Sequence, residues 1–223
     1  MMNTSNLSKI YKHGLDETLA LKDINISINK GDKVLIKGVS GAGKSSLINI
    51  LGFLDFDFSG EYIFNKQSYK NLSSNEIAKI RNKEFGYIFQ EYALIENESV
   101  IENIRVPLLY SNIISKNHDI KITDLLQKLE LTEQKNKKVK HLSGGQRQRV
   151  AIARALINEP NVIIADEPTG SLNKDLKKDM LNILFDYVKD NKTLILITHD
   201  FEYIDEDYFK IIHLENGFLK SNK

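Results

Sequence analysis

The sequence predicts an α/β fold built on a buried parallel sheet, with a block of helices inserted into the middle of the chain. Apolar strands alternate with a helical segment in the last third of the sequence, a pattern typical of parallel strands covered on both faces. Helical periodicity dominates from about residue 91 to residue 156. Because strands precede and follow this block, we interpret it as an insertion into one fold rather than as a second fold.

The first part of the chain is expected to be rich in strands. Alternating apolar runs at 24–28 and 33–37 predict an N-terminal pair of strands. The next predicted element is a helix over 44–54, and further strands follow at 60–65 and 84–90. The chain therefore enters the helical block directly from a strand.

The later part of the chain carries the strongest signals. Helical spacing recurs at 122–131 within the block, and again at 176–190. Apolar runs at 161–166, 193–198 and 208–217 predict strands on either side of that second helix. A strand, a helix and a strand in this order form the unit from which parallel sheets are made.

Composition narrows the class of protein. The 223 residues are enough for one sizeable core, and a formal net charge of +1 gives no reason to expect bulk attraction to nucleic acid or anionic lipid. The absence of cysteine excludes disulfides and thiolate metal sites, which fits a reducing cytoplasm. No apolar run approaches the ~20 residues that span a bilayer, and the N-terminus lacks the apolar stretch of a signal peptide. We therefore expect a cytoplasmic protein that reaches a membrane only through a partner.

Residues 38–45, "GVSGAGKS", match the pattern G-x-x-x-x-G-K-[ST] between a predicted strand and a predicted helix. Glycines let consecutive amides fold around phosphate oxygens, and the start of a helix adds its dipole. Lys44 is placed to reach the β- and γ-phosphates of a nucleotide, and the Ser45 hydroxyl to join a Mg²⁺ shell. A glycine-rich turn with a chance lysine is the alternative, which the flanking elements disfavour. The expected nucleotide-binding residues here are Gly38, Ser40, Gly41, Ala42, Gly43, Lys44, Ser45 and Ser46.

Two adjacent acids, Asp166 and Glu167, end the predicted strand at 161–166. They could simply cap a helix or face solvent. Parallel sheets, however, bind ligands beyond the carboxyl ends of their strands, which is the edge that the phosphate loop also leaves. We expect Asp166 to hold Mg²⁺, directly or through water, and Glu167 to polarise an attacking water.

Three further polar or aromatic side chains fall at informative positions. Gln90 ends one predicted strand and His199 another, so both are expected at the same edge of the sheet. Gln90 would contact Mg²⁺ and the water, and His199 would hydrogen-bond the γ-phosphate. Tyr11 lies upstream of the phosphate loop, where it would stack on adenine. Each of the three taken alone is more often structural, and their convergence favours the functional interpretation.

The segment "HLSGGQRQRV" predicts a helix with an unusual start. Ser143 lies where an N-cap belongs, but Gly144 and Gly145 follow, and each costs about 1 kcal/mol relative to alanine inside a helix. Arg147 and Arg149 lie close to the positive end of the helix dipole. Such a start indicates that an anion comes very close to bare backbone.

Taken together, these motifs resemble the nucleotide-binding subunit of an ATP-binding cassette (ABC) transporter over nearly the whole chain. In sequence order the matches are Tyr11 at the A-loop, 38–45 at Walker A, Gln90 at the Q-loop, 142–146 at the signature "LSGGQ", 161–167 at Walker B with Glu167 last, and His199 at the switch histidine. The stretches "SLINILGFLD", "FGYIFQEYALI" and "ADEPTGSLN" resemble cassettes of the lipoprotein-releasing, macrolide-exporter and antimicrobial-peptide type. "FQEYALIENESVIENI" is most similar to cassettes of bacteriocin exporters.

The resemblance implies a single ABC ATPase domain over residues 1–223. Its RecA-like P-loop NTPase core, with an N-terminal antiparallel β subdomain, would comprise 1–90 and 157–223, and the helical signature subdomain 91–156. The cofactors would be ATP and Mg²⁺. The residues implied in catalysis are Glu167, His199, Gln90 and Lys44, and those implied in metal binding are Ser45, Gln90 and Asp166.

The resemblance also implies the partners. Two cassettes, either identical copies or a pair of different cassettes, would dimerise head to tail on ATP, and a separate integral membrane permease would hold them at the inner face of the membrane. The signature would then contact the γ-phosphate bound by the other copy, which supplies the anion. The residues that would make this contact are Ser143, Gly144, Gly145 and Gln146. One departure is Asn173, because the family usually has aspartate at this D-loop position.

Three functions are compatible with such a cassette. The expected one is ATP hydrolysis that powers export of, or resistance to, a peptide, bacteriocin or other amphiphile. The alternative is a cassette that regulates a membrane protein without transport, as in cell division. Cassettes acting on ribosomes or DNA usually fuse two cassettes or add long coiled coils, and this sequence has neither, so no nucleic acid partner is expected.

Overall fold

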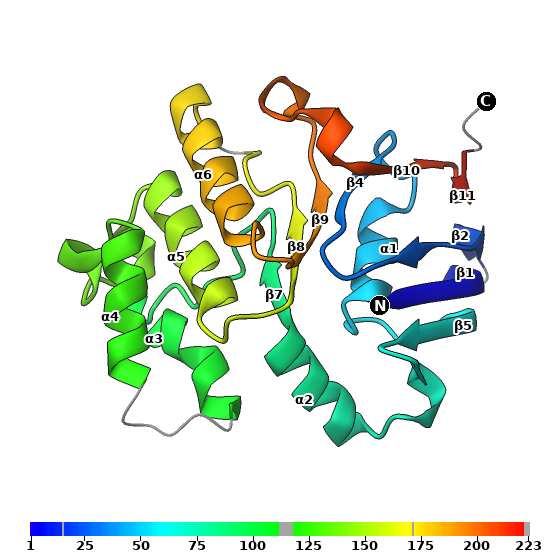
Figure 1. Ribbon diagram of the computed structural model, residues 1–223, viewed down its shortest axis with the longest axis horizontal. Helices are drawn as coiled ribbons and strands as arrows, with labels where there is room; N and C mark the ends of the chain where they lie inside the picture. The colour runs from blue at the N-terminus through cyan, green and yellow to red at the C-terminus, as the bar shows by residue number, and fades with distance from the viewer. Residues whose placement is uncertain (15, 112–117, 171, 221–223) are drawn as a thin grey trace.

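The computed structural model describes residues 1–14, 16–111, 118–170 and 172–220. A group of helices, a parallel sheet and an antiparallel sheet lie side by side, in that order across Figure 1. The helices are α1 (Lys44–Leu51), α2 (Ser74–Glu84), α3 (Val100–Arg105), α4 (His118–Lys128), α5 (Gly144–Leu156) and α6 (Lys174–Tyr187). The strands are β1 (Met2–His13), β2 (Asp16–Ile24), β3 (Ser27–Ile28), β4 (Lys33–Lys37), β5 (Ser59–Phe64), β6 (Gln67–Ser68), β7 (Phe85–Ile88), β8 (Val162–Asp166), β9 (Thr193–Ile197), β10 (Lys210–Glu215) and β11 (Phe218–Leu219).

The larger sheet has the strand order β11-β10-β4-β9-β8-β7, and β10, β4, β9, β8 and β7 run parallel. Every residue of β9 is buried, which confirms the predicted buried parallel sheet. Ile197 of β9 pairs with Ile36 of β4 and with Asp166 of β8. The carboxyl ends of these three strands therefore lie level with one another, and the phosphate loop, the two acids and His199 all leave the sheet there.

The smaller sheet corrects one expectation. Residues 24–28 and 33–37 do not pair with each other, because β3 pairs with β1 and β4 belongs to the parallel sheet. The run 24–28 is also interrupted between β2 and β3, where the Asn25 side chain accepts a hydrogen bond from the N–H of Asn6 at 2.8 Å. Apolar alternation predicts that a segment is a strand, but not which strand it pairs with.

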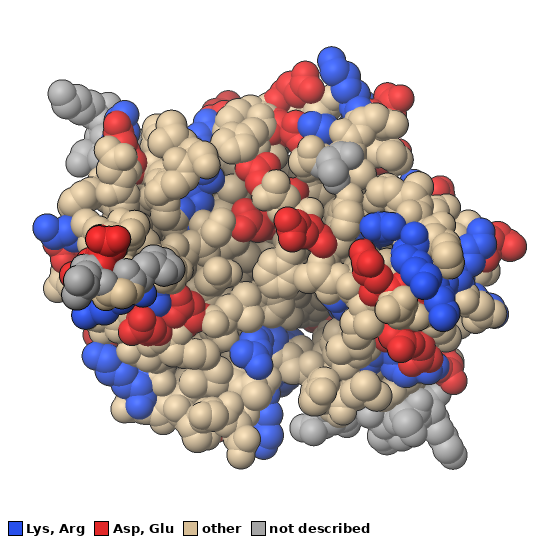
Figure 2. Space-filling view, turned by 180° about the vertical axis from the view of Figure 1, so that it is seen from behind, with Lys and Arg blue, Asp and Glu red and all other residues tan. Residues whose placement is uncertain are grey.

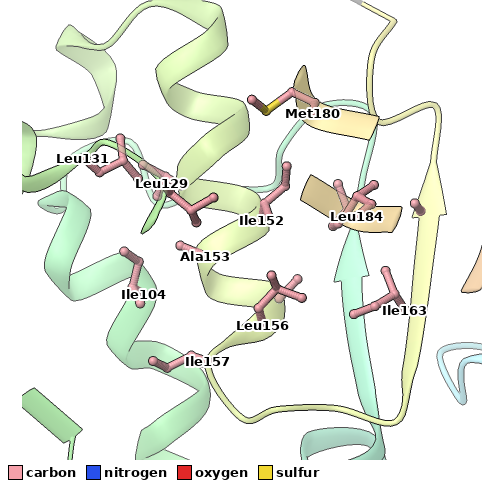
Figure 3. Packing of buried hydrophobic residues seen from close by; sticks show 14 of the residues in the cluster. Ile104, Leu129, Leu131, Ile152, Ala153, Leu156, Ile157, Ile163, Met180 and Leu184 are labelled. Atoms are coloured by element: carbon pink, nitrogen blue, oxygen red, sulfur yellow. The ribbon is translucent and has the colours of Figure 1, made fainter. Parts of the chain in front are cut away.

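The helical block packs on the parallel sheet through α5. Figure 3 shows Ile152 and Leu156 of α5 beside Leu184 of α6 and Ile163 of β8. On its other side, α5 meets Ile104 of α3 and the chain that follows α4. The first turn of α5, which carries the signature, is thereby attached to the same core as the strands that end in the acids.

Two helices differ from the sequence expectation. No residue of α2 is fully buried, and its apolar face consists of Ile77 and Ile80, which pack partly buried against the core. A capping box of Ser73 and Glu76 defines its start. Helix α1 ends at Leu51, three residues earlier than expected, because Phe53 adopts a φ of 56° that a helix does not accommodate.

Charges of both signs are mixed over the face seen in Figure 2, as the net charge of +1 suggests. The largest group of Lys and Arg side chains lies at the edge formed by the helices, on the right of that view, with Asp and Glu side chains beside it. Among the described helices, none is both long enough and apolar enough to cross a membrane.

Candidate functional site

A cleft of about 650 Å³ lies at the carboxyl ends of β4, β8 and β9. It brings together most of the residues that the sequence singled out, although they come from five separate segments of the chain. The predicted residues that line it are Tyr11, Ser40, Gly41, Gly43, Lys44, Ser45, Ser46, Gln90, Asp166, Glu167 and His199. Gly38 and Ala42 belong to the same loop without lining the cleft, and the side chain of Ala42 is buried.

The phosphate loop exposes backbone amides at the start of α1. Gly43 is the N-cap with a φ of 98°, and a Cβ atom there would lie 2.3 Å from the carbonyl oxygen of Ala20, so both conformation and space require glycine. No side chain of the described residues caps this helix. The Lys44 ammonium donates to the carbonyl oxygens of Gly38 at 2.7 Å and Val39 at 3.0 Å, which holds it over the loop. Free amides beside a fixed ammonium suit a phosphate group.

The residues expected to hold Mg²⁺ fit that ion. The Ser45 hydroxyl donates to Asp166 Oδ2 at 2.9 Å, and Gln90 lines the same cleft. Burial raises the pKa of the Asp166 carboxyl, while the Ser45 hydrogen bond and Lys44 act in the opposite direction. No group of three or more His, Cys, Asp or Glu that could hold a metal occurs among the described residues. Mg²⁺ commonly takes only one or two protein oxygens and completes its shell with phosphates and water.

Glu167 is held in a constrained position beside His199. Its φ of 47° is left-handed, and its N–H donates to the carbonyl oxygen of Ile197 at 2.9 Å. Glu167 Oε2 accepts a hydrogen bond from the His199 N–H at 3.2 Å. Glu167 Oε1 lies 3.2 Å from His199 Nε2 without hydrogen-bond geometry, and this buried oxygen has no hydrogen-bond partner among the described residues. Because a buried acceptor usually has a donor, Oε1 is suited to a bound water.

Tyr11 lines the cleft next to the phosphate loop. Its hydroxyl is 3.3 Å from Ser46 Oγ. The ammonium of Lys9 lies 4.7 Å from the centroid of the Tyr11 ring and pairs with Asp55 at 3.0 Å. Contacts at the hydroxyl and over the ring hold Tyr11 in place, and its ring borders the cleft.

The signature residues lie apart from this cleft. Ser143 caps α5 as expected, since its hydroxyl accepts from the Gln146 N–H at 3.3 Å and Gln146 Oε1 accepts from the Ser143 N–H at 3.1 Å. Among the residues that line the cleft, none belongs to Ser143–Gln146. Gly144 is exposed, and a Cβ there would meet only Tyr92 at 3.6 Å. Gly145 is buried, and its Cβ would lie 2.9 Å from Leu176 Cδ1, so the two glycines have different surroundings.

Several residues at the site were not singled out from the sequence. Thr18, Leu19 and Ala20 line the cleft from β2, and Gly170, Lys177 and Asp200 line it from the two loops and α6 beyond the acids. Arg154 of α5 donates to the carbonyl oxygens of Tyr92 at 2.8 Å and Ala93 at 2.5 Å, which fixes the segment after Gln90. Since these contacts join positions about sixty residues apart in the sequence, no local sequence pattern predicts them.

The ionised Glu167 carboxyl should weaken the fold at neutral pH. Burial is the main cause that raises its pKa in the folded chain. A carboxyl with a raised folded-state pKa favours folding below its unfolded pKa, and this contribution is lost as pH rises through the folded-state pKa. We therefore expect Glu167→Gln to raise the Tm at pH 7.5, with a gain that disappears near pH 4. Differential scanning fluorimetry in EDTA measures this; an equal gain at both pH values would contradict it.

Comparisons with known proteins agree with this geometry. A family model described as ABC transporter matches residues 21–170. The chain is 40% identical over 219 residues to the lipoprotein-releasing system ATP-binding protein LolD of Buchnera aphidicola subsp. Schizaphis graminum, covering 98% of this chain and 95% of that protein. It is 40% identical over 217 residues to the macrolide export ATP-binding/permease protein MacB of Pasteurella multocida, covering 97% of this chain but only 33% of that relative.

A solved structure has the same fold. It is the dimeric, post-hydrolysis state of the ATP-binding cassette MJ0796 bound to ADP and Pi, with a TM-score of 0.90 and 35% sequence identity. The alignment covers 99% of this chain and 97% of that chain. The fold is therefore that of an ATP-hydrolysing cassette, as the motifs predicted.

Proposed function

This chain belongs to the ABC transporter family as an ATP-binding, ATP-hydrolysing cassette, and we propose that it drives a separate membrane permease. The proposed cargo is a peptide, a bacteriocin or another amphiphile. One observation carries the proposal: the phosphate loop, both acids, Gln90 and His199 line a single cleft. That constellation supplies a phosphate cradle, cation ligands and a base, the parts that phosphoryl transfer to water needs.

The phosphate-binding part of the mechanism falls to the loop and its lysine. Lys44 and the amides that precede it bind the β- and γ-phosphates, while Tyr11 stacks on the adenine. Ser45, Asp166 and Gln90 would hold Mg²⁺, which would supply positive charge beside the phosphate oxygens. The 2.9 Å contact between Ser45 and Asp166 supports this assignment, because it places two oxygen ligands side by side.

The water-activating part falls to Glu167. Its unpartnered Oε1 accepts the proton of a water positioned against the γ-phosphate. His199 orients the Glu167 carboxylate through its N–H, and its imidazole would hydrogen-bond the γ-phosphate. Because His199 is largely exposed at the cleft while Glu167 is largely buried, His199 is free to contact a phosphate.

The nucleotide site is completed by a second copy in our proposal. The signature residues lie outside the chain's own cleft, and the backbone at Gly144 is exposed. Two copies arranged head to tail bring Ser143, Gly144 and Gln146 of one to the γ-phosphate of the other. In this arrangement Gly145 serves to let α5 pack on Leu176 of its own chain.

A second cleft is the surface that we propose for the permease. It has a volume of about 490 Å³ and lies between α2, the turn at Val106–Tyr110 and α5. Its walls include Leu54, Phe89 and Tyr110, and the Tyr110 side chain is 75% exposed. Exposed apolar side chains around a hollow mark a binding surface for another protein. The cassette would then be held peripherally at the membrane.

Vesicles that contain this cassette and the membrane protein encoded beside it test the transport function. We expect ATP to drive movement of an amphiphilic peptide across the bilayer, and Tyr110→Ser to reduce it without lowering ATP hydrolysis by the isolated cassette. Tyr208→Ser is the matched control, since Tyr208 is equally exposed and lies outside this second cleft. ATP hydrolysis without movement of any tested cargo would favour the regulatory alternative.

The D-loop asparagine provides a separate test. Asn173 caps α6 by accepting a hydrogen bond from the Leu176 N–H at 3.1 Å, and aspartate caps helices equally well. Asn173→Asp should therefore restore the charge usual in this family without disturbing α6. We expect a higher steady-state ATPase rate, whereas an unchanged or lower rate would show that the charge does not limit the enzyme.

A further inference from the structure

An ion pair between Lys177 and Asp200 borders the cleft. The Lys177 ammonium donates to Asp200 Oδ1 at 2.5 Å, and the Thr169 hydroxyl donates to Asp200 Oδ2 at 2.7 Å. The side chains of Lys177 and Asp200 are only 19% and 16% exposed, and Thr169 is fully buried. Both carboxylate oxygens of Asp200 are therefore engaged in a largely dry environment, where such bonds are strong.

These three residues tie together three separate segments. Thr169 lies two residues after Glu167, Lys177 lies in the first turn of α6, and Asp200 directly follows His199. The Asp200 N–H also donates to the Thr198 hydroxyl at 3.0 Å, so the loop that carries His199 is fixed on both sides of that residue.

The same turn of α6 packs on the signature. The space that a Cβ of Gly145 would occupy is filled by Leu176, whose Cδ1 atom is 2.9 Å from that position. Leu176 directly precedes Lys177. Contacts therefore run without a break from the first turn of α5 through Leu176 and Lys177 to Asp200, next to His199.

We propose that Lys177 is a positioning residue for ATP hydrolysis, which holds the His199 loop, through Asp200, to the helix that packs on the signature. This inference rests on the proposed roles of Glu167 and His199. The N–H of His199 donates to Glu167 Oε2, so a displaced His199 loop misplaces the carboxylate that activates water. A displacement of about 1 Å at a reacting group can cost on the order of 100-fold in rate.

Removing the Lys177 ammonium tests its proposed positioning role. In Lys177→Met, Asp200 keeps its charge in a largely buried position but loses its cation, so its loop rearranges. We expect kcat for ATP hydrolysis to fall about 10- to 100-fold, with KM for ATP nearly unchanged. Lys177→Arg should restore most of the rate because a guanidinium also pairs with a carboxylate. Lys178→Met is the control, since Lys178 is the exposed neighbour on the same helix.

Further variants keep the proposal open to refutation. Asp200→Asn should lower kcat similarly, and the Lys177→Met/Asp200→Asn double variant should be no slower than the slower single variant, because both changes break one contact. A folded Lys177→Met protein with the wild-type kcat would overturn the proposal. An increase in KM at constant kcat would overturn it as well, since Lys177 would then bind nucleotide directly. If Lys177→Met does not fold, kcat and KM of Lys177→Gln and Asp200→Asn test the proposal in its place, with the same expected results.

These measurements use the cassette alone, so they are independent of the transport function. A cassette that hydrolyses ATP and responds to Lys177→Met as expected, but moves no cargo in vesicles, would contradict the transport proposal only. A wild-type rate in folded Lys177→Met beside ATP-driven transport would contradict the inference about Lys177 only.

Discussion

Glu167→Gln should nearly abolish ATP turnover while sparing ATP binding. Gln keeps an oxygen that can accept the His199 N–H, so the loop geometry persists, but it cannot take a proton from water. General-base assistance contributes about 10²–10⁴-fold, and we expect kcat to fall by that factor. Because the bound ATP is then not consumed, the variant should elute as a dimer with ATP and as a monomer without it.

Single-turnover hydrolysis and size-exclusion chromatography measure the two effects. Glu133→Gln is a suitable control, since Glu133 is an exposed acid outside the cleft. Hydrolysis by Glu167→Gln at the wild-type rate would remove Glu167 from the mechanism. Turnover that is lost together with ATP binding would instead show that Glu167 supports the site structurally.

Lys44→Ala should impair ATP binding and hydrolysis together. The ammonium is held over the phosphate loop by two carbonyl oxygens, so it meets the phosphates in both the ground state and the transition state. A hydrogen bond to a charged group contributes about 1.5–3 kcal/mol, which corresponds to a roughly 10- to 100-fold weaker Kd for ATP. Isothermal titration with ATP measures this, with Lys30→Ala as an exposed lysine control. An unchanged Kd would contradict the proposed role.

The sequence predicts the parts of the site that depend on residues close together in the chain or on the ends of predicted strands. The phosphate loop is contiguous, and its spacing between a strand and a helix fixes where Lys44 and Ser45 lie. Asp166, Glu167 and His199 are predictable because parallel strands end at one edge, and the pairing of Ile197 with Asp166 places them there.

The parts that the sequence does not predict depend on contacts between distant segments. No apolar pattern in the sequence shows that β3 pairs with β1. Helix α2 has no fully buried residue that would mark it as a helix in the sequence. Likewise, Lys177 and Asp200 are ordinary surface residues in the sequence, and only the fold places them 2.5 Å apart at the cleft. The packing of Leu176 on Gly145 is of the same kind, and it changes which signature glycine is free to meet a phosphate.

The central claim is that each nucleotide site combines the phosphate loop of one copy with the signature of another. Mixing two damaged variants tests it, with Glu167→Gln in both to retain bound ATP. One variant is Lys44→Ala. The other is Gly144→Asp, which places a negative charge at an exposed first position of α5, where an acid favours the helix but repels a phosphate.

The measurement is the number of ATP molecules occluded per purified mixed dimer. If the sites are shared between copies, the mixed dimer has one doubly damaged site and one intact site, and we predict one occluded ATP. Dimers of either variant alone should occlude none. If both motifs served the nucleotide of their own chain, every site in the mixed dimer would carry a defect. Finding no occluded ATP in verified mixed dimers would therefore contradict the shared site.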